Sequence, residues 1–218
     1  MMRSASFHMS SIWTRRVLTA AVLAPALLLL ACGGDDSPKN RIKPIQATLT
    51  IDPFPNSPDP AVYLVKDPKN GQFPDLETVQ IRLYTTAPVT FDAYTIEMHF
   101  DPSKVQVGNA FEFDAGILGG CNSGLPCAPT CLINQSDVNS TGTLLIGVAK
   151  KATCPDTTVS LDTMLVRIGF IAQTTIDPPG TPIDLIQGAG HGDCEILLGL
   201  TDLGIPCVGG NALMTASR

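Results

Sequence analysis

The chain has 218 residues, of which 44% are hydrophobic and 16% are charged, and its formal net charge is −6 at pH 7. Lys and Arg number 14, against 20 Asp and Glu. Nucleic acids and anionic lipid headgroups are bound through basic surfaces, so this balance argues against a nucleic-acid partner.

The N-terminal segment has the three-part organisation of an export signal. Arg15 and Arg16 precede an apolar run of 14 residues, 17–30, which ends in Leu-Leu-Ala-Cys at Cys32. A run of this length is too short to span about 30 Å of hydrocarbon comfortably, which favours a cleavable signal over a membrane helix. The final four residues resemble the lipobox of bacterial lipoproteins. The resemblance implies that residues 1–31 are removed and that Cys32 carries the lipid.

A small, polar segment follows the expected lipidation site and is predicted to be a flexible tether over residues 32–45. Gly33 stands where an Asp retains some bacterial lipoproteins at the inner membrane. We therefore expect an exported protein held at the cell envelope by its lipid, at the outer membrane. Cleavage would remove three Arg and no acid, so 11 basic and 20 acidic residues would remain, a net charge of −9.

Six cysteines remain after Cys32, and an even number in an oxidising compartment indicates three disulfides. They are Cys121, Cys127, Cys131, Cys154, Cys194 and Cys207. A zinc site is the alternative, but the C-x5-C-x3-C spacing lacks the usual C-x2-C pairs. Among the 15 conceivable pairings, Cys194 with Cys207 is favoured because the two flank one short turn segment, and Cys154 is expected to meet Cys127 or Cys131.

Residues 46–215 are expected to form one domain of short strands, because helical periodicity is nearly absent and 18 Pro and 19 Gly interrupt the chain. Strands are predicted at 46–52, 61–66, 78–85, 93–100, 131–137, 143–150, 164–173, 182–187, 194–200 and 207–214. Residues 139–142 are predicted to be the turn of a hairpin. The pattern is typical of an all-β fold, an antiparallel jelly-roll β-sandwich of about nine strands.

Three of these segments alternate between apolar and polar residues, so each should bury one face. The residues expected inside are Val79, Ile81, Leu83, Tyr94, Ile96, Met98, Phe100, Met164, Val166, Ile168 and Phe170. The residues expected outside are Gln80, Arg82, Tyr84, Ala93, Thr95, Glu97 and His99.

No motif for catalysis or cofactor binding stands out, so we expect neither an enzyme nor a cofactor. His191 lies close to Asp193, but a Gly-rich turn accounts for this pair better than a catalytic role. A structural calcium ion is a second interpretation of the loop aspartates, although turn formation explains them better. These are Asp52, Asp59, Asp67 and Asp75.

Four segments in chain order resemble the cohesin domain, the β-sandwich that binds dockerin modules in cellulosomes. They are AYTIEMHFDPSKVQV at 93–107, GTLLIGVA at 142–149, MLVRIGFIA at 164–172 and IPCVGGNAL at 205–213. The first contains an aromatic-Asp-Pro turn at Asp101, and the last contains the pair Gly209-Gly210. The resemblance implies a non-catalytic binding domain, in a superfamily that also includes carbohydrate-binding modules.

Two ligand classes follow from this resemblance. The first is a protein module such as a dockerin, recognised by an exposed sheet face; the candidate residues are Tyr84, Ala93, Thr95, Glu97 and His99. Cohesins often carry Asn and Asp near the start of the corresponding strand, where this chain has Ala93 and Thr95. The second is a polysaccharide, for which Tyr63 and Tyr84 are the exposed aromatic candidates. A structural spacer in the envelope, without a specific ligand, is the third interpretation.

Overall fold

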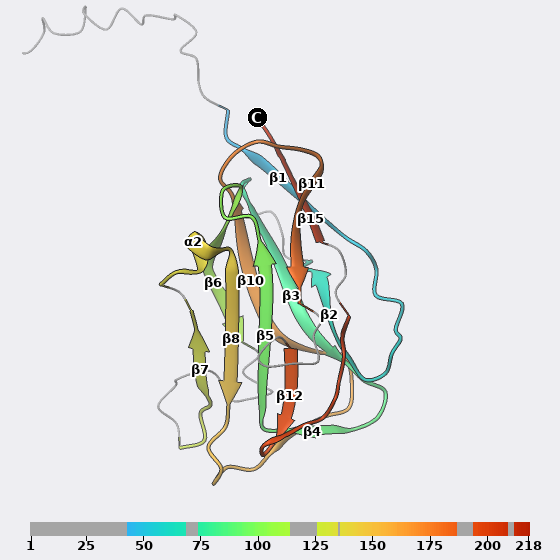
Figure 1. Cartoon of the computed structure of the whole chain (residues 1–218). Coiled ribbons are helices and arrows are strands. Elements are labelled where there is room, and N and C mark those ends of the chain that lie inside the picture. The colour runs from blue at the N-terminus through green and yellow to red at the C-terminus, as the bar shows by residue number, and fades with distance from the viewer. Residues whose placement is uncertain (1–42, 69–73, 114–125, 135, 187–193, 209–211) are drawn as a thin grey trace, which may run out of the picture. The chain divides into compact units, whose positions relative to one another are not determined.

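The computed structural model describes residues 43–68, 74–113, 126–134, 136–186, 194–208 and 212–218, all within one compact unit, Ile42–Arg218. These residues form fifteen strands and one short helix (Figure 1). In chain order they are β1 (Gln46–Ile51), β2 (Ala61–Lys66), β3 (Leu76–Tyr84), β4 (Val89–Phe91), β5 (Ala93–Phe100), β6 (Val105–Phe113), β7 (Thr130–Ile133), α2 (Val138–Thr141), β8 (Thr143–Ala149), β9 (Thr157–Val159), β10 (Thr163–Ala172), β11 (Ile176–Leu185), β12 (Cys194–Leu198), β13 (Thr201–Asp202), β14 (Cys207–Val208) and β15 (Ala212–Ser217). In this described part of the chain, no helix has the length and apolar character needed to cross a bilayer.

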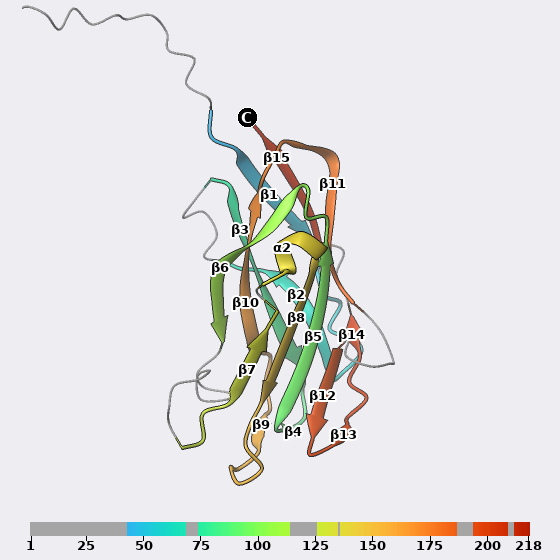
Figure 2. The same ribbon diagram turned by 60° about the vertical axis from the view of Figure 1, so that its left-hand side comes forward.

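The strands form two large sheets that face each other (Figures 1 and 2). The first sheet has eight strands, of which β1, β15, β11 and β5 follow one another in this order. β5 also pairs with β12 and with β8. β13 pairs with β12, and β7 pairs with β8. The second sheet has the order β14-β2-β3-β10-β6. All pairs are antiparallel except the parallel pair of β14 with β2. The predicted antiparallel β-sandwich is confirmed.

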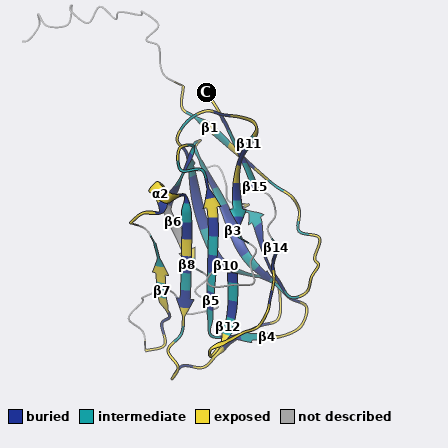
Figure 3. Cartoon of the chain, viewed as in Figure 1, coloured by how far each residue is buried: buried dark blue, intermediate teal, exposed yellow. Residues whose placement is uncertain are grey.

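Apolar side chains from both sheets form one continuous core between them. On β5, the four residues expected inside, Tyr94 to Phe100 in alternation, are all buried, as are Val79, Ile81 and Leu83 on β3. Figure 3 shows this alternation along the central strands. The period of two therefore identified the inner faces of these strands correctly, since successive side chains point to opposite sides of a sheet.

A β-bulge changes the inner face of β10 at its start. The register with β3 shifts between Met164 and Val166, so Leu165 and Val166 are both buried and Met164 is only half-buried. The prediction that Met164 lies inside with Val166 was therefore wrong. A bulge inserts one residue into one strand of a pair, which strict alternation cannot anticipate.

A single helical turn, α2, replaces the turn that was predicted at residues 139–142. Gly142 ends it with φ +73°, and a Cβ at this position would lie 2.3 Å from the carbonyl oxygen of Phe100. The amide of Phe100 donates to the carbonyl of Gly142 at 2.9 Å, which fixes this close approach. Antiparallel pairing of β7 with β8 is nevertheless present on either side of the turn.

The strand predicted at 207–214 is two strands in different sheets. β14 pairs with β2 in the five-stranded sheet, whereas β15 lies between β1 and β11 in the eight-stranded sheet. The Gly209-Gly210 pair lies between them, outside the described residues. One apolar run thus supplies both layers, a division that composition alone cannot reveal.

Candidate protein-binding face

The outer face of the eight-stranded sheet presents a regular surface around β5. Thr95 on β5 pairs with Gly147 on β8 and with Glu195 on β12. Glu97 pairs with Leu145 one step further along β5. Because cross-strand partners point to the same side of a sheet, these side chains share one outer surface. We call this surface the β5 face, and it includes Leu132 of β7, which pairs with Gly147.

Two exposed leucines make the β7 and β8 side of the β5 face apolar. The side chain of Leu132 is 69% exposed and that of Leu145 is 41% exposed. Both belong to regular strands, so their exposure is not that of a loop tip. Clusters of exposed apolar side chains on a folded surface commonly mark interaction sites.

Gly147 leaves a bare stretch of backbone between these leucines and Thr95. A Cβ added at Gly147 would meet only the Cβ of Leu132, at 4.0 Å, which is an ordinary van der Waals distance. Packing within the domain therefore does not require glycine at this position. Glycine inside a strand lowers stability and often marks a close approach by another backbone or a ligand.

The charged groups beside these leucines are predominantly acidic. Glu97 lies within 2.6 Å of His99, from Oε1 to Nε2, and Asp184 of β11 pairs with His99 across the strands. Glu195 on β12 lies beside Thr95, on the side away from Gly147. The strands β5, β8 and β12 contain no Lys or Arg. The face therefore combines exposed leucines with carboxylates, a composition suited to a partner with apolar and basic groups.

Tyr84 does not belong to the β5 face. It lies on β3 in the other sheet, where its ring packs edge-on against Phe54 with centroids 5.4 Å apart. Ala93, Thr95, Glu97 and His99 do lie together on β5, as their alternation predicted. Grouping Tyr84 with them was wrong, because alternation identifies the side of a strand but not the sheet to which the strand belongs.

Tyr63 is buried, so the prediction that it is an exposed aromatic residue was wrong. It lies on β2, stacks on Phe54 with centroids 4.4 Å apart, and donates its hydroxyl to Asp162 at 2.9 Å. Burial and this hydrogen bond raise the pKa of Tyr63 to about 12. Both aromatic candidates for stacking on a sugar thus pack against Phe54.

Two disulfides lie within the described residues. Cys194 pairs with Cys207, the pairing favoured by their flanking of one turn segment, and Cys127 pairs with Cys154. Cys131 is also disulfide-bonded. Cys32 and Cys121 lie outside the described residues.

The remaining candidates for chemistry are not assembled into a site. His191 and Asp193 lie outside the described residues. The carboxylate of Asp67 is buried in an ion pair with Arg167, and that of Asp59 accepts the backbone amide of Thr86 at 3.1 Å. Within the described ranges, no three His, Cys, Asp or Glu side chains gather in a way that could hold a metal ion.

Sequence reasoning missed Leu132, Leu145, Gly147 and Glu195 as members of the face. A signal for two of them was present, because alternation in GTLLIGVA places Leu144, Ile146 and Val148 inside and leaves Leu145 and Gly147 outside. The neighbours of β5 could not be read locally, since sheet order is set by long-range pairing.

Comparison with known proteins places the fold and not the ligand. No family model and no curated protein matches the chain. The solution structure of CaCohA2 from Clostridium acetobutylicum is similar, with a TM-score of 0.50 and 14% identity over 72% of this chain and 92% of that chain. A crystal structure of a CaDoc0917(R16D)-CaCohA2 complex has a TM-score of 0.48 and 13% identity over 69% of this chain and 97% of that chain. The sixth cohesin of Acetivibrio cellulolyticus scaffoldin B, in complex with a Cel5 dockerin mutant, has a TM-score of 0.49 and 13% identity over 70% of this chain and 97% of that chain. The described domain is thus an antiparallel β-sandwich of cohesin-like fold.

Proposed function

We propose that this protein is a non-catalytic binding component of the cell envelope, and that its β5 face recognises a protein module of the dockerin kind. The observation that carries the proposal is the exposed apolar part of that face on β7 and β8, where Leu132 and Leu145 lie beside the bare backbone of Gly147. Buried apolar contacts at the centre of an interface provide most of its affinity, and surrounding polar groups provide specificity.

The comparison with CaCohA2 supports a protein as the ligand. That protein shares the fold and is named in a complex with CaDoc0917. A polysaccharide is less well supported, because a sugar platform needs accessible aromatic faces and Phe54 packs against both Tyr63 and Tyr84. An envelope spacer without a ligand does not account for the exposed leucines.

The proposal is tested by partner capture with the full chain and matched variants. Leu145→Glu places a charge in the apolar part of the β5 face. Leu161→Glu places the same charge between β9 and β10, at a leucine that is 74% exposed. Proteins retained from the producing culture by the wild-type chain and by Leu161→Glu, but lost with Leu145→Glu, would support the β5 face. Equal retention by all three chains would refute it.

Gly147 provides a second test that separates binding from stability. Gly147→Thr should raise the free energy of unfolding by about 0.5–1 kcal/mol, because glycine is poorly suited to a strand and the new Cβ has room. The same variant should lose the captured partner, since the added side chain blocks close approach. Denaturant unfolding and partner capture measure the two effects; unchanged capture would remove Gly147 from the interface.

The envelope location is part of the proposal and has its own test. We propose that Cys32 carries the lipid, that residues 32–45 are the tether and that the protein is held at the outer membrane. Cys32→Ala should move the protein from the membrane fraction to the soluble fraction and abolish incorporation of labelled fatty acid. Labelling that persists in Cys32→Ala would exclude this anchor.

A further inference from the structure

The edge strand β7 carries the most exposed leucine of the β5 face, and its own packing is sparse. The strand has four residues, none of them fully buried, and it pairs only with β8 among the described strands. Figure 2 shows β7 beside β8 at the edge of the sheet. Short strands with few buried contacts and solvent-exposed backbone hydrogen bonds open readily. Leu132 therefore stays in place on the β5 face only if the ends of β7 are held.

Two attachments hold the ends of β7. After its last residue, Asn134 accepts the amide of Leu145 at 2.7 Å and donates to the carbonyl of Thr143 at 2.8 Å. Before its first residue, the disulfide between Cys127 and Cys154 joins β7 to the segment that follows β8. A side-chain amide thus holds one end of β7 and a covalent bond holds the other.

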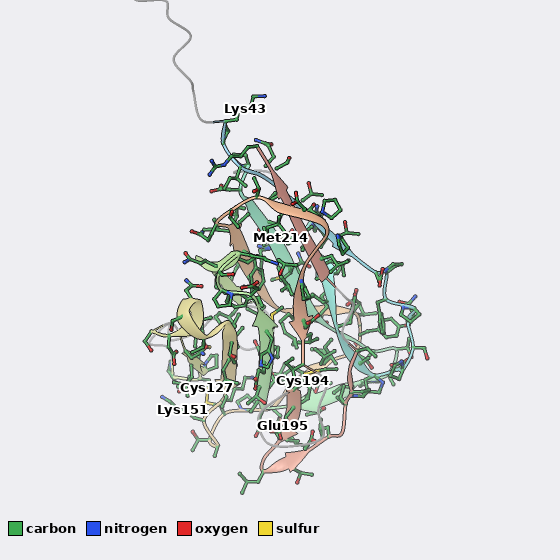
Figure 4. The ribbon with its side chains drawn as sticks, turned by 45° about the horizontal axis from the view of Figure 1, so that its top comes forward. Lys43, Cys127, Lys151, Cys194, Glu195 and Met214 are labelled. Atoms are coloured by element: carbon green, nitrogen blue, oxygen red, sulfur yellow. A yellow bond between two sulfur atoms is a disulfide. The ribbon has the colours of Figure 1, made fainter. Side chains whose placement is uncertain are left out.

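The segment that carries Cys154 is itself held close to β5. The amide of Cys154 donates to the carbonyl of Lys151 at 2.9 Å. The amide of Lys150 donates to the carbonyl of Asp92, the residue before β5, at 2.8 Å. Figure 4 shows Cys127 and Lys151 close together on the side of the sandwich where β7 and β8 lie. The disulfide therefore connects the start of β7 to a turn that is hydrogen-bonded to the middle of the sheet.

The disulfide of Cys131 cannot replace this connection. Cys131 lies on β7 and is also disulfide-bonded. Cys154 is the one cysteine in the sequence between residues 132 and 193, and it pairs with Cys127. The bond of Cys131 therefore reaches neither β8 nor the segment after it. The Cys127–Cys154 bridge is the covalent link between β7 and the β8 side of the sheet.

We propose that the Cys127–Cys154 disulfide is a positioning element of the binding site, which holds β7 so that Leu132 lies on the β5 face beside Gly147. This inference rests on the proposed function, because it concerns the same interface. Without the bridge, β7 opens from its first residue while the rest of the sandwich stays folded. A partner would then have to order β7 as it binds, or lose the contact with Leu132, and the loss of one buried leucine weakens binding by about tenfold or more.

The experiment compares the full-length paired variant Cys127→Ala/Cys154→Ala with Leu49→Ala. Leu49 is buried on β1, at the opposite edge of the same sheet, so its truncation also lowers stability but leaves β7 intact. Hydrogen exchange measures the opening of β7, at a temperature at which both variants are folded. Capture measures binding of the proteins that Leu145→Glu fails to retain. In the paired variant, exchange in β7 should rise and capture should fall, each by about tenfold or more, whereas Leu49→Ala should change neither.

A measurement on the wild-type chain covers the case in which the paired variant fails to fold. Cys127 is exposed, so a dithiol can reduce its bridge in the folded protein, and iodoacetamide then blocks the thiols. Peptide mass spectrometry gives the fraction of molecules alkylated at both Cys127 and Cys154. Capture should fall in proportion to this fraction.

The other outcomes overturn the inference. Unchanged exchange in β7 or unchanged capture by the paired variant would each do so, as would full capture by chains alkylated at both cysteines. An equal loss of capture in Leu49→Ala would show that binding follows overall stability and not the position of Leu132. Retention by Leu145→Glu would contradict the β5 face itself, whatever the exchange in β7. Loss with Leu145→Glu but retention by the paired variant would contradict the positioning role alone.

Discussion

At the scale of single residues, a polar network stabilises the outer side of the five-stranded sheet. Asp162 accepts hydrogen bonds from the hydroxyl of Tyr63 and from Nε of Arg82, at 2.9 and 3.0 Å. Burial alone would lower the pKa of Arg82, but the hydrogen bond and charge of Asp162 outweigh it, and the pKa is raised. Gln80, expected outside, is buried and accepts from Arg82 at 2.7 Å. Its burial is tolerated because its amide oxygen is satisfied.

The raised pKa of Tyr63 predicts a pH dependence of stability. The folded-state pKa of about 12 lies above the ordinary value of 10.0, so folding favours the protonated phenol. The stabilisation from this group is complete below about pH 10 and is lost as pH rises toward 12. We expect Tyr63→Phe to show a smaller loss of unfolding free energy over that interval than the wild type, as measured by urea unfolding. A loss of equal size in both proteins would show that other groups account for it.

At the scale of single elements, two side-chain amides near α2 form hydrogen bonds with the backbone of neighbouring strands. Asn134 accepts the amide of Leu145 at 2.7 Å and donates to the carbonyl of Thr143 at 2.8 Å, which continues the pairing of β7 with β8. Asn139 pairs in the same way with the amide and carbonyl of Val107 on β6. The helical turn thus connects the edges of both sheets.

Two glycines with positive φ should respond differently to the same substitution. Gly142→Ala would bring a Cβ to 2.3 Å from the carbonyl oxygen of Phe100, whereas Gly199→Ala would meet nothing within 4 Å. Gly199→Ala should therefore cost only the left-handed backbone conformation, about 1–2 kcal/mol. Gly142→Ala should cost clearly more, because backbone must also move. Chemical denaturation of both variants measures the difference; equal costs would contradict the close approach at Gly142.

At the scale of the whole molecule, one disulfide connects the two layers. Cys194 lies on β12 in the eight-stranded sheet and Cys207 on β14 in the five-stranded sheet, with Cα atoms 6.1 Å apart. Cys127 and Cys154 are 27 residues apart in sequence and join the segment before β7 to the segment after β8. Cross-links of this kind restrict the unfolded chain.

Removal of these disulfides should lower stability by similar amounts. The chain-entropy model gives about 3 kcal/mol for the 13-residue separation of Cys194 and Cys207, and slightly more for the 27-residue separation of Cys127 and Cys154. For a domain of this size, each loss corresponds to a fall in Tm of roughly 10 °C. Paired Cys→Ser variants and calorimetry test this. An unchanged Tm in either paired variant would show that its bridge contributes nothing to stability.

Several features of the fold could be predicted from the sequence because they depend on near neighbours. The alternation of β3 and β5 identified their buried faces, and Asp101 forms the expected turn by accepting the amide of Ser103 at 3.0 Å. Met164 was misplaced because a bulge inserts a residue, and α2 was missed because its single turn carries no periodic signal. Neither a bulge nor a single helical turn produces a sequence pattern longer than a few residues.

The sequence by itself determined that this domain is built of β-strands and which side of β3 and β5 is apolar, since a strand places successive side chains on opposite sides. Only the tertiary structure decided which strands lie side by side. It separated Tyr84 from β5, placed Leu132 beside Gly147 and divided the strand predicted at 207–214 between two sheets. The physical reason is that strand pairing is long-range: its backbone hydrogen bonds are the same for any sequence, and the choice of partner depends on how both faces of the whole sandwich pack.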